Sequence, residues 1–130
     1  MNRPIERRLV VASGGDVDAA SQAALRAARR AGFSVMRQFC VAGLVSELGR
    51  DLVNRSGRAL LLLRDESDGD QARLRLVWQG TGGAQTAAVP PDPGSAAAWL
   101  ARWRLGELAV ETDDDSARLT VALAQPKTLN

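Results

Sequence analysis

Apolar residues recur with a helical period over two stretches in the first half of the chain. The first stretch places five small or branched residues on one face: Val17, Ala20, Ala24, Ala28 and Ala31. This spacing predicts an amphipathic helix. Asp16 stands where an N-cap is expected, and Gly32 is placed to end the helix as its C′ residue.

A second, longer helix is predicted to begin after Ser34 as its N-cap. Its expected apolar stripe consists of Met36, Phe39, Cys40, Leu44, Leu48 and Leu52. Gly43 and Gly49 lie inside this helix, where each costs about 1 kcal/mol relative to Ala. Such glycines are tolerated best where another group must approach the helix backbone closely.

Strand-like runs flank the two helices. Apolar, alternating or β-branched residues predict strands at about residues 7–12, 58–67, 72–78, 107–112 and 117–123. In the third of these strands, Leu74, Leu76 and Trp78 share one face, while Arg73 and Arg75 share the other. One side of the sheet is therefore expected to be covered and the other to be solvated.

The segment QGTGGAQTAAVPPDPG, residues 79–94, holds four glycines and three prolines and is expected to be a loop. The sequence SAAAWLARWRLG after it predicts a short third helix. The resulting order predicts one α+β domain over residues 1–130, in which helices cover one face of a mixed, mostly antiparallel sheet in a two-layer α/β sandwich.

The composition excludes several kinds of chemistry. The chain has no histidine, which excludes His-based triads, imidazole metal sites and phospho-His relays. Cys40 is the only cysteine, so an internal disulfide is excluded and a buried thiol is expected. The sequence also lacks a signal peptide and a long apolar run, which favours a cytoplasmic protein without membrane contact.

The basic residues are unevenly distributed. The 17 basic and 15 acidic residues leave a net charge of only +2. Residues 1–58, however, carry ten Arg against five acidic residues. This asymmetry favours one basic surface patch on the protein over direct nucleic-acid binding. A solvated face and a surface for an acidic partner both remain open for the Arg cluster on the two predicted helices, which consists of Arg26, Arg29, Arg30 and Arg37.

Three stretches stand out together: AALRAARRAGFSVMRQFCVAGLVSELGRD, LVWQGTGG and GELAVETDDDSARLTVAL. They resemble the histidine-kinase-like ATPase fold (the GHKL or Bergerat type), and within it the bacterial anti-sigma-factor and RsbT-type switch serine kinases. The segment AALRAARRAGFSVMRQFCVAGLVSELGRD is similar to the family's paired helices. LVWQGTGG stands where the family has its first glycine box, and GELAVETDDDSARLTVAL is similar to its closing hairpin. The likeness covers roughly residues 7–125.

The resemblance implies a site for ATP and Mg²⁺. Glu47 matches the general base of the family's E-x-x-x-N motif, and Asp51 stands at the position of its Asn, which would make Asp51 a cofactor-binding residue and metal ligand. Gly80 and Gly82 match glycines of the phosphate-binding box. Trp78, however, replaces the Asp that holds adenine in the family, and a large indole there would occupy the space of the base. Without the resemblance, Glu47 and Asp51 are the solvated edge of a helix, with Arg50 and Arg55 as partners.

The resemblance implies a regulatory protein of bacterial signalling that acts in anti-sigma or stress-response partner switching, mainly by protein–protein interaction and with ATP binding weakened or lost. Its implied partners are a STAS-domain antagonist, a sigma factor or a phosphatase. The alternative is an active ATP-dependent serine/threonine kinase that phosphorylates a STAS-domain antagonist. A domain that adds only a dimerisation surface to a separate kinase or sensor subunit, and with it a homodimer, also remains open.

Overall fold

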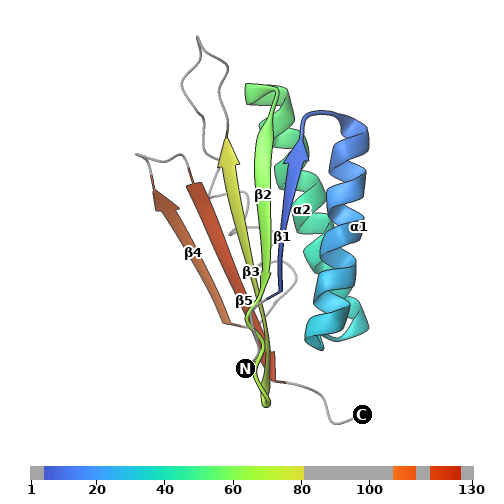
Figure 1. Cartoon of the computed structure of the whole chain (residues 1–130), viewed down its shortest axis with the longest axis vertical. Coiled ribbons are helices and arrows are strands. Elements are labelled where there is room, and N and C mark those ends of the chain that lie inside the picture. Colours follow the sequence, from blue (N-terminus) through green and yellow to red (C-terminus); the bar gives the residue numbers. More distant parts are fainter. Residues whose placement is uncertain (1–4, 81–106, 114–117, 127–130) are drawn as a thin grey trace.

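The computed structural model describes residues 5–80, 107–113 and 118–126. These residues form a strand, two helices and four further strands in chain order (Figure 1). The bounds are β1 (Ile5–Val11), α1 (Gly14–Ala31), α2 (Val35–Ser56), β2 (Ala59–Asp65), β3 (Gln71–Gly80), β4 (Glu107–Asp113) and β5 (Arg118–Pro126).

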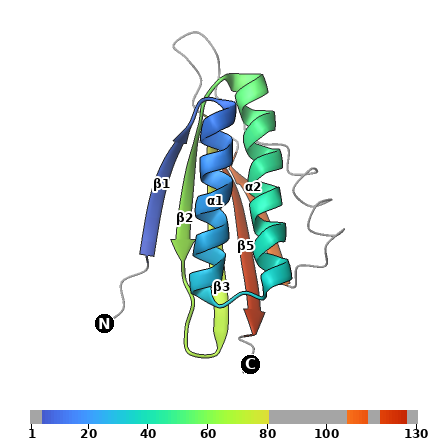
Figure 2. The same cartoon turned by 90° about the vertical axis from the view of Figure 1, so that its right-hand side faces the viewer.

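The five strands form one sheet in the order β1-β2-β3-β5-β4. Each pair of neighbouring strands among the described residues is antiparallel. Helices α1 and α2 lie side by side on one face of this sheet (Figures 1 and 2). The two-layer α+β sandwich expected from the sequence is therefore confirmed, and the described part of the sheet is purely antiparallel.

The N-cap of helix α1 lies three residues before the expected one. Ser13 is the N-cap, and its Oγ accepts a hydrogen bond from the backbone N–H of Asp16 at 3.2 Å. Asp16 lies in the first turn, where its Oδ2 accepts from the backbone N–H of Ala12 at 3.0 Å. The assignment of Asp16 as N-cap was wrong because the S-x-x-D spacing, a relative of the capping box, places the hydroxyl residue first.

The link between the helices follows the sequence closely. Gly32 adopts the left-handed conformation, with φ of 100°, and the N–H of Phe33 donates to the carbonyl of Ala28 at 3.0 Å. This pattern of bonds is a Schellman motif, which favours glycine at the left-handed position. Ser34 then caps α2 through its Oγ, as predicted. Its backbone N–H donates to Oε1 of the buried Gln125 at 3.2 Å, which joins the start of α2 to β5.

The core lies between the helices and the inner face of the sheet. The sheet contributes alternate residues such as Leu61, Leu63, Leu74, Leu76, Trp78, Leu119, Val121 and Leu123. From α2 come Cys40, Val41, Leu44, Val45, Leu48 and Leu52. Met36 and Phe39, which the sequence placed in this stripe, are instead 71% and 63% exposed. That part of the predicted stripe was wrong, because Phe39 lies on the opposite side of the helix from the buried residues and Met36 lies beyond the edge of the buried stripe.

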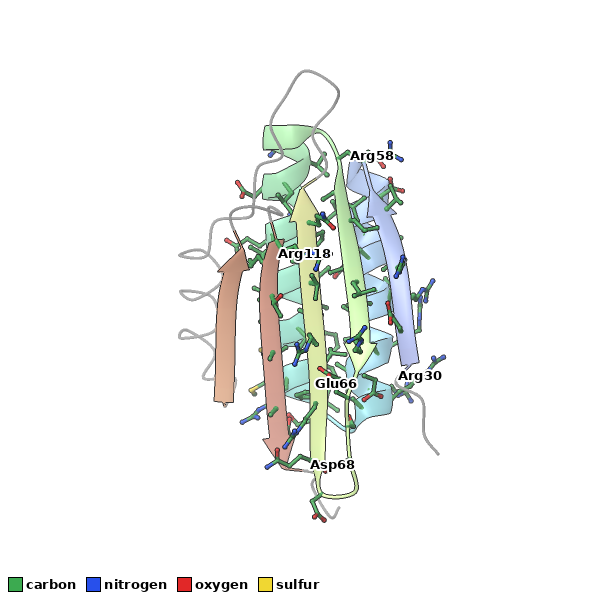
Figure 3. The ribbon with its side chains drawn as sticks, turned by 60° about the vertical axis from the view of Figure 1, so that its left-hand side comes forward. Arg30, Arg58, Glu66, Asp68 and Arg118 are labelled. Carbon is green, nitrogen blue, oxygen red and sulfur yellow. The ribbon has the colours of Figure 1, made fainter. Side chains whose placement is uncertain are left out.

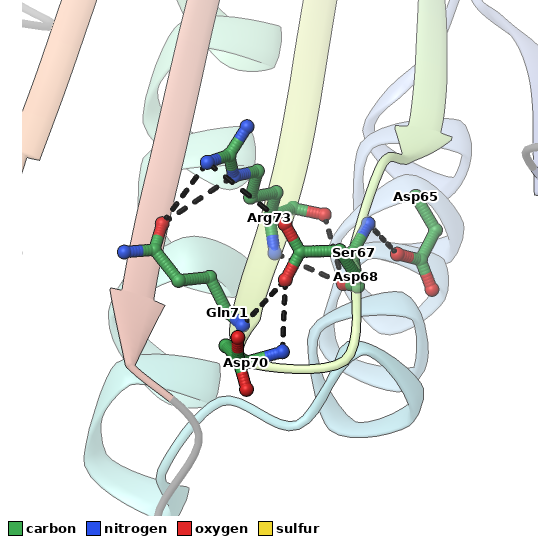
Figure 4. A network of polar contacts seen from close by, with 6 residues as sticks. All are labelled: Asp65, Ser67, Asp68, Asp70, Gln71 and Arg73. Atoms are coloured by element: carbon green, nitrogen blue, oxygen red, sulfur yellow. Dashed lines mark hydrogen bonds and ion pairs between the residues drawn. The ribbon is translucent and has the colours of Figure 1, made fainter.

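A network of side-chain and backbone hydrogen bonds orders the connection between β2 and β3 (Figure 4). Asp65 Oδ1 accepts from the backbone N–H of Ser67 at 2.9 Å, and Asp68 Oδ1 accepts from the N–H groups of Asp70 and Gln71 at 2.9 and 2.8 Å. Aspartate commonly stabilises turns in this way. The network fixes the orientation of Asp65, the last residue of β2.

Candidate functional site

Glu47 and Asp51, the carboxylates implied as base and metal ligand, lie one turn apart on α2. Glu47 is exposed, and Asp51 is partly exposed. Glu47 forms no ion pair with another described residue, so the expected pairing with Arg50 does not occur. The structure thus brings the two carboxylates to one solvent-facing edge of the helix. Among the described residues, it forms no group of three or more acidic or Cys side chains that could hold a metal ion.

The helix turn that carries these carboxylates contacts Trp78 through its opposite side. Trp78 lies on the inner face of β3, as the alternation predicted, and is fully buried. A methyl group at Gly49 would lie 3.3 Å from Cη2 of Trp78 and 3.4 Å from both Cγ atoms of Val17. The indole therefore fills the space between α1, α2 and the sheet. Gly49 is the glycine at which another group approaches the helix backbone closely.

Trp78 gives an adenine base neither space nor a polar anchor. An Asp at this position would point a carboxylate into the layer between helices and sheet, whereas here the indole occupies that layer with none of its surface exposed. Its Nε1–H is buried and has no hydrogen-bond partner in the described part of the chain. Tryptophan can only donate a hydrogen bond, whereas the amino group of adenine needs an acceptor. The described residues therefore do not fit an adenine nucleotide at this position.

The remaining residues implied for nucleotide binding lie at or beyond the end of β3. Gly80 is the last residue of β3 and pairs with Ala59 of β2. Gly82, the loop predicted after it and the short third helix with Trp99 and Trp103 lie outside the described residues. The phosphate-binding role of the glycines therefore stays a prediction.

An apolar patch that the sequence did not identify lies at the start of α2. Val35, Met36 and Phe39 are 66%, 71% and 63% exposed. Three large apolar side chains exposed on two adjacent helical turns are characteristic of surfaces that contact another molecule. We call these three residues the α2 apolar patch. The periodic pattern concealed it because two of its three residues, Met36 and Phe39, were assigned to the core.

The sheet face opposite the helices carries a groove of about 350 Å³. Four arginines line it, from β1, β2, β3 and β5: Arg8, Arg64, Arg75 and Arg118. Its floor includes the half-buried Leu60 and Leu62. Figure 3 shows this face, with Arg118 and Glu66 labelled. The solvated face expected from Arg73 and Arg75 is therefore confirmed, and it is basic and hollowed.

Two glutamates partly neutralise this groove. Arg64 lies directly opposite Arg75 in the pairing of β2 with β3, an arrangement that costs energy between like charges. Glu6 accepts from Arg64 at 3.1 Å and lies 3.5 Å from Arg8, while Glu66 pairs with Arg75. In the described part of the chain, Arg118 forms no ion pair. Counted over the side chains that the structure describes, the groove therefore keeps a net positive charge.

A scan against protein-family models and a search of curated proteins both found no match to this chain. Neither α1 nor α2, the helices within the described residues, combines the length and apolarity needed to cross a membrane. The likeness to the switch kinases thus rests on the sequence stretches given above, and the assignment to that family stays a prediction.

Proposed function

We propose that this chain is a regulatory protein of bacterial signalling that acts in the cytoplasm by binding a partner protein, with the ATP site of a switch kinase weakened or lost. The observation that carries the proposal is the burial of Trp78 against Gly49. The indole stands where the resemblance implies an acceptor for adenine. Glu47 and Asp51 then remain on α2 as an exposed and a partly exposed carboxylate without a nucleotide beside them.

The α2 apolar patch supports the protein-binding part of the proposal. Aromatic residues and methionine are enriched in the contact surfaces of protein complexes. The patch projects from a helix that is anchored at its start by Ser34 and Gln125, so it is presented without a large ordering cost. The resemblance implies a STAS-domain antagonist, a sigma factor or a phosphatase as the partner.

Calorimetric titration with ATP–Mg²⁺ tests the loss of nucleotide binding. We expect no measurable heat of binding at millimolar nucleotide. A dissociation constant below about 100 μM would contradict the proposal and favour the serine/threonine kinase. In that case Glu47→Ala should leave affinity largely intact and abolish phosphoryl transfer to a STAS-domain substrate.

Titration with purified STAS-domain, sigma-factor and phosphatase candidates tests the docking role. If one of them binds, the double variant Met36→Ser/Phe39→Ser should weaken that complex at least about tenfold. Val10→Ser is the matched control, because Val10 is also exposed, at 53%, but lies on β1. Equal losses in the two variants, or binding by none of the candidates, would contradict the proposal.

A further inference from the structure

A second basic pocket lies on the helix side of the sheet, between α1 and the β1–β2 edge. It has a volume of about 50 Å³. Three arginines line it: Arg7 from β1 and Arg26 and Arg30 from α1. Figure 3 labels Arg30. A cavity of this size holds more than one water-sized group and so accommodates a small oxyanion.

The floor of this pocket is apolar and holds one acid. Ala23 and Ala27 of α1 and Leu63 of β2 form the floor, and Asp65 supplies the single carboxylate. The small alanine side chains leave room between the helix and the strand. Asp65 is already oriented by its hydrogen bond from the backbone N–H of Ser67, at 2.9 Å (Figure 4).

Within the described residues, Asp65 is the one acid beside the three arginines, and it forms no ion pair with them. All three side chains are exposed, and none forms an ion pair or a hydrogen bond with another described side chain. Arg26 and Arg30 stand one turn apart on α1, a spacing at which like charges weaken a helix. With Asp65 as the only acid, the pocket keeps two uncompensated positive charges.

Helix stability explains only part of this arrangement. Arg29 and Arg30 lie in the last turn of α1, where positive charge interacts favourably with the helix dipole. Arg26 lies about one turn earlier, and Arg7 lies on a different element. Neither gains from the dipole. The helix dipole therefore does not account for the placement of Arg26 and Arg7 beside Arg30.

We propose that this pocket binds a phosphate group, as the free anion or as a phosphate monoester. A phosphate dianion balances the two uncompensated charges, and guanidinium groups recognise phosphate through paired N–H donors. The site is formed by α1, β1 and β2 and shares no residue with the α2 apolar patch or with Glu47 and Asp51. The proposal therefore does not depend on the proposed function.

Titration with inorganic phosphate, followed by NMR at constant ionic strength, tests this site. We expect saturable shifts confined to the backbone amides of Arg7, residues 23–30 and residues 63–65. Arg26→Ala and Arg30→Ala should each weaken binding at least about fivefold, as expected for the loss of a charged hydrogen bond. Arg29→Ala is the matched control, because it removes the same charge from the same helix at an exposed position outside the pocket.

O-phosphoserine and acetate complete the experiment. Binding of phosphoserine at least as tight as that of phosphate shows that the site accepts an esterified phosphate, whereas binding of inorganic phosphate alone shows that it is selective for the free anion. Acetate should bind much more weakly, because it carries one charge. A linear, unsaturated response to phosphate, or an Arg29→Ala variant as weak as Arg26→Ala, would overturn the proposal. Circular dichroism of each variant confirms that the fold is retained.

Discussion

The indole of Trp78 lies against the backbone of α2 at Gly49, where a methyl group would stand only 3.3 Å from its Cη2 atom. Contacts this short are rarely seen for a side-chain carbon in a folded protein. The glycine therefore serves the packing of Trp78, the largest fully buried side chain in the part of the chain that the structure describes. Its cost to the helix, about 1 kcal/mol, is offset by the burial of that indole.

Replacing Gly49 with Val should destabilise the protein. The added methyl groups would collide with Trp78 and Val17, both almost completely buried, and overpacking of this kind costs about 1–3 kcal/mol. The measurement is the free energy of unfolding in urea. Gly15→Val is the matched control, because Gly15 is exposed in the first turn of α1 and only Ser13 Oγ, at 3.8 Å, lies within 4 Å of the added carbon.

The same contact predicts a coupling between the two positions. Trp78→Leu alone should cost several kcal/mol because it leaves a cavity beneath α2, on the order of 3 kcal/mol. In that background Gly49→Val should cost less than in the wild-type protein, since the smaller side chain leaves room. Strictly additive free energies in the double-mutant cycle would show that the two residues do not share this space.

Gln125→Leu should destabilise the protein although it adds apolar surface to the core. Gln125 is 5% exposed, and its Oε1 accepts the N–H of Ser34 at 3.2 Å. Leucine leaves that N–H without its partner at the start of α2, which costs about 1–3 kcal/mol. Thermal unfolding followed by circular dichroism measures the loss. Gln22→Leu, at an exposed position of α1, should change the melting temperature little.

Ser13→Ala should weaken the start of α1. The change removes the Oγ that accepts from the N–H of Asp16, and the loss of an N-cap typically costs about 1 kcal/mol. Chemical denaturation measures the change in stability. Ser13→Asn keeps a side-chain acceptor and should retain most of the wild-type value. An alanine variant as stable as the wild-type protein would show that Asp16 caps the helix without help.

The thiol of Cys40 should make stability fall at alkaline pH. Burial raises the pKa of this thiol, and the positive charge of Arg37 opposes the rise in part. The pKa of the thiol is higher in the folded than in the unfolded protein, so its contribution to the free energy of unfolding is fully present below the unfolded pKa of about 8.5. That contribution is lost as pH rises through the folded pKa. The chain has no Tyr and a single Lys, so few other groups titrate in this window.

Comparing wild type with Cys40→Ala isolates this effect. The difference in their free energies of unfolding should be constant around neutral pH. At alkaline pH the wild-type protein should lose stability relative to Cys40→Ala. A difference independent of pH across that range would contradict the assignment. The native thiol should also react slowly with alkylating reagents at neutral pH, since the thiolate is the reactive form.

The buried face of α2 shows which core residues a simple spacing pattern predicts and which it misses. Residues 36, 40, 44, 48 and 52 follow a spacing of four, but each such step rotates by roughly 40° around a straight helix. Over the full series this rotation places Met36 outside the buried face of the helix. Phe39 lies on the side of the helix opposite to that face. Val41 and Val45, which are buried, follow from the same geometry once the rotation is counted.

The sequence predicted where single residues of the candidate site lie, but not which of them contact one another. Alternation along β3 correctly placed Trp78 on the inner face, and the cost of glycine in a helix correctly indicated a close approach. Which glycine contacts which side chain depends on the position of α2 along the sheet. That offset is set by tertiary packing, and a local pattern carries no information about it. The same holds for the pocket of Arg7, Arg26 and Arg30, which joins residues from α1, β1 and β2.

The position of β1 at the outside of the sheet has a consequence for solubility. Its neighbour β2 contains four successive leucines, Leu60–Leu63, the kind of sequence that adds strands from other molecules when its edge is open. β1 covers that edge and presents Glu6, Arg7 and Arg8 in its place. β1 thus covers the apolar edge of β2 with a strand that carries charged residues. A chain without β1 would tend to assemble into intermolecular sheets.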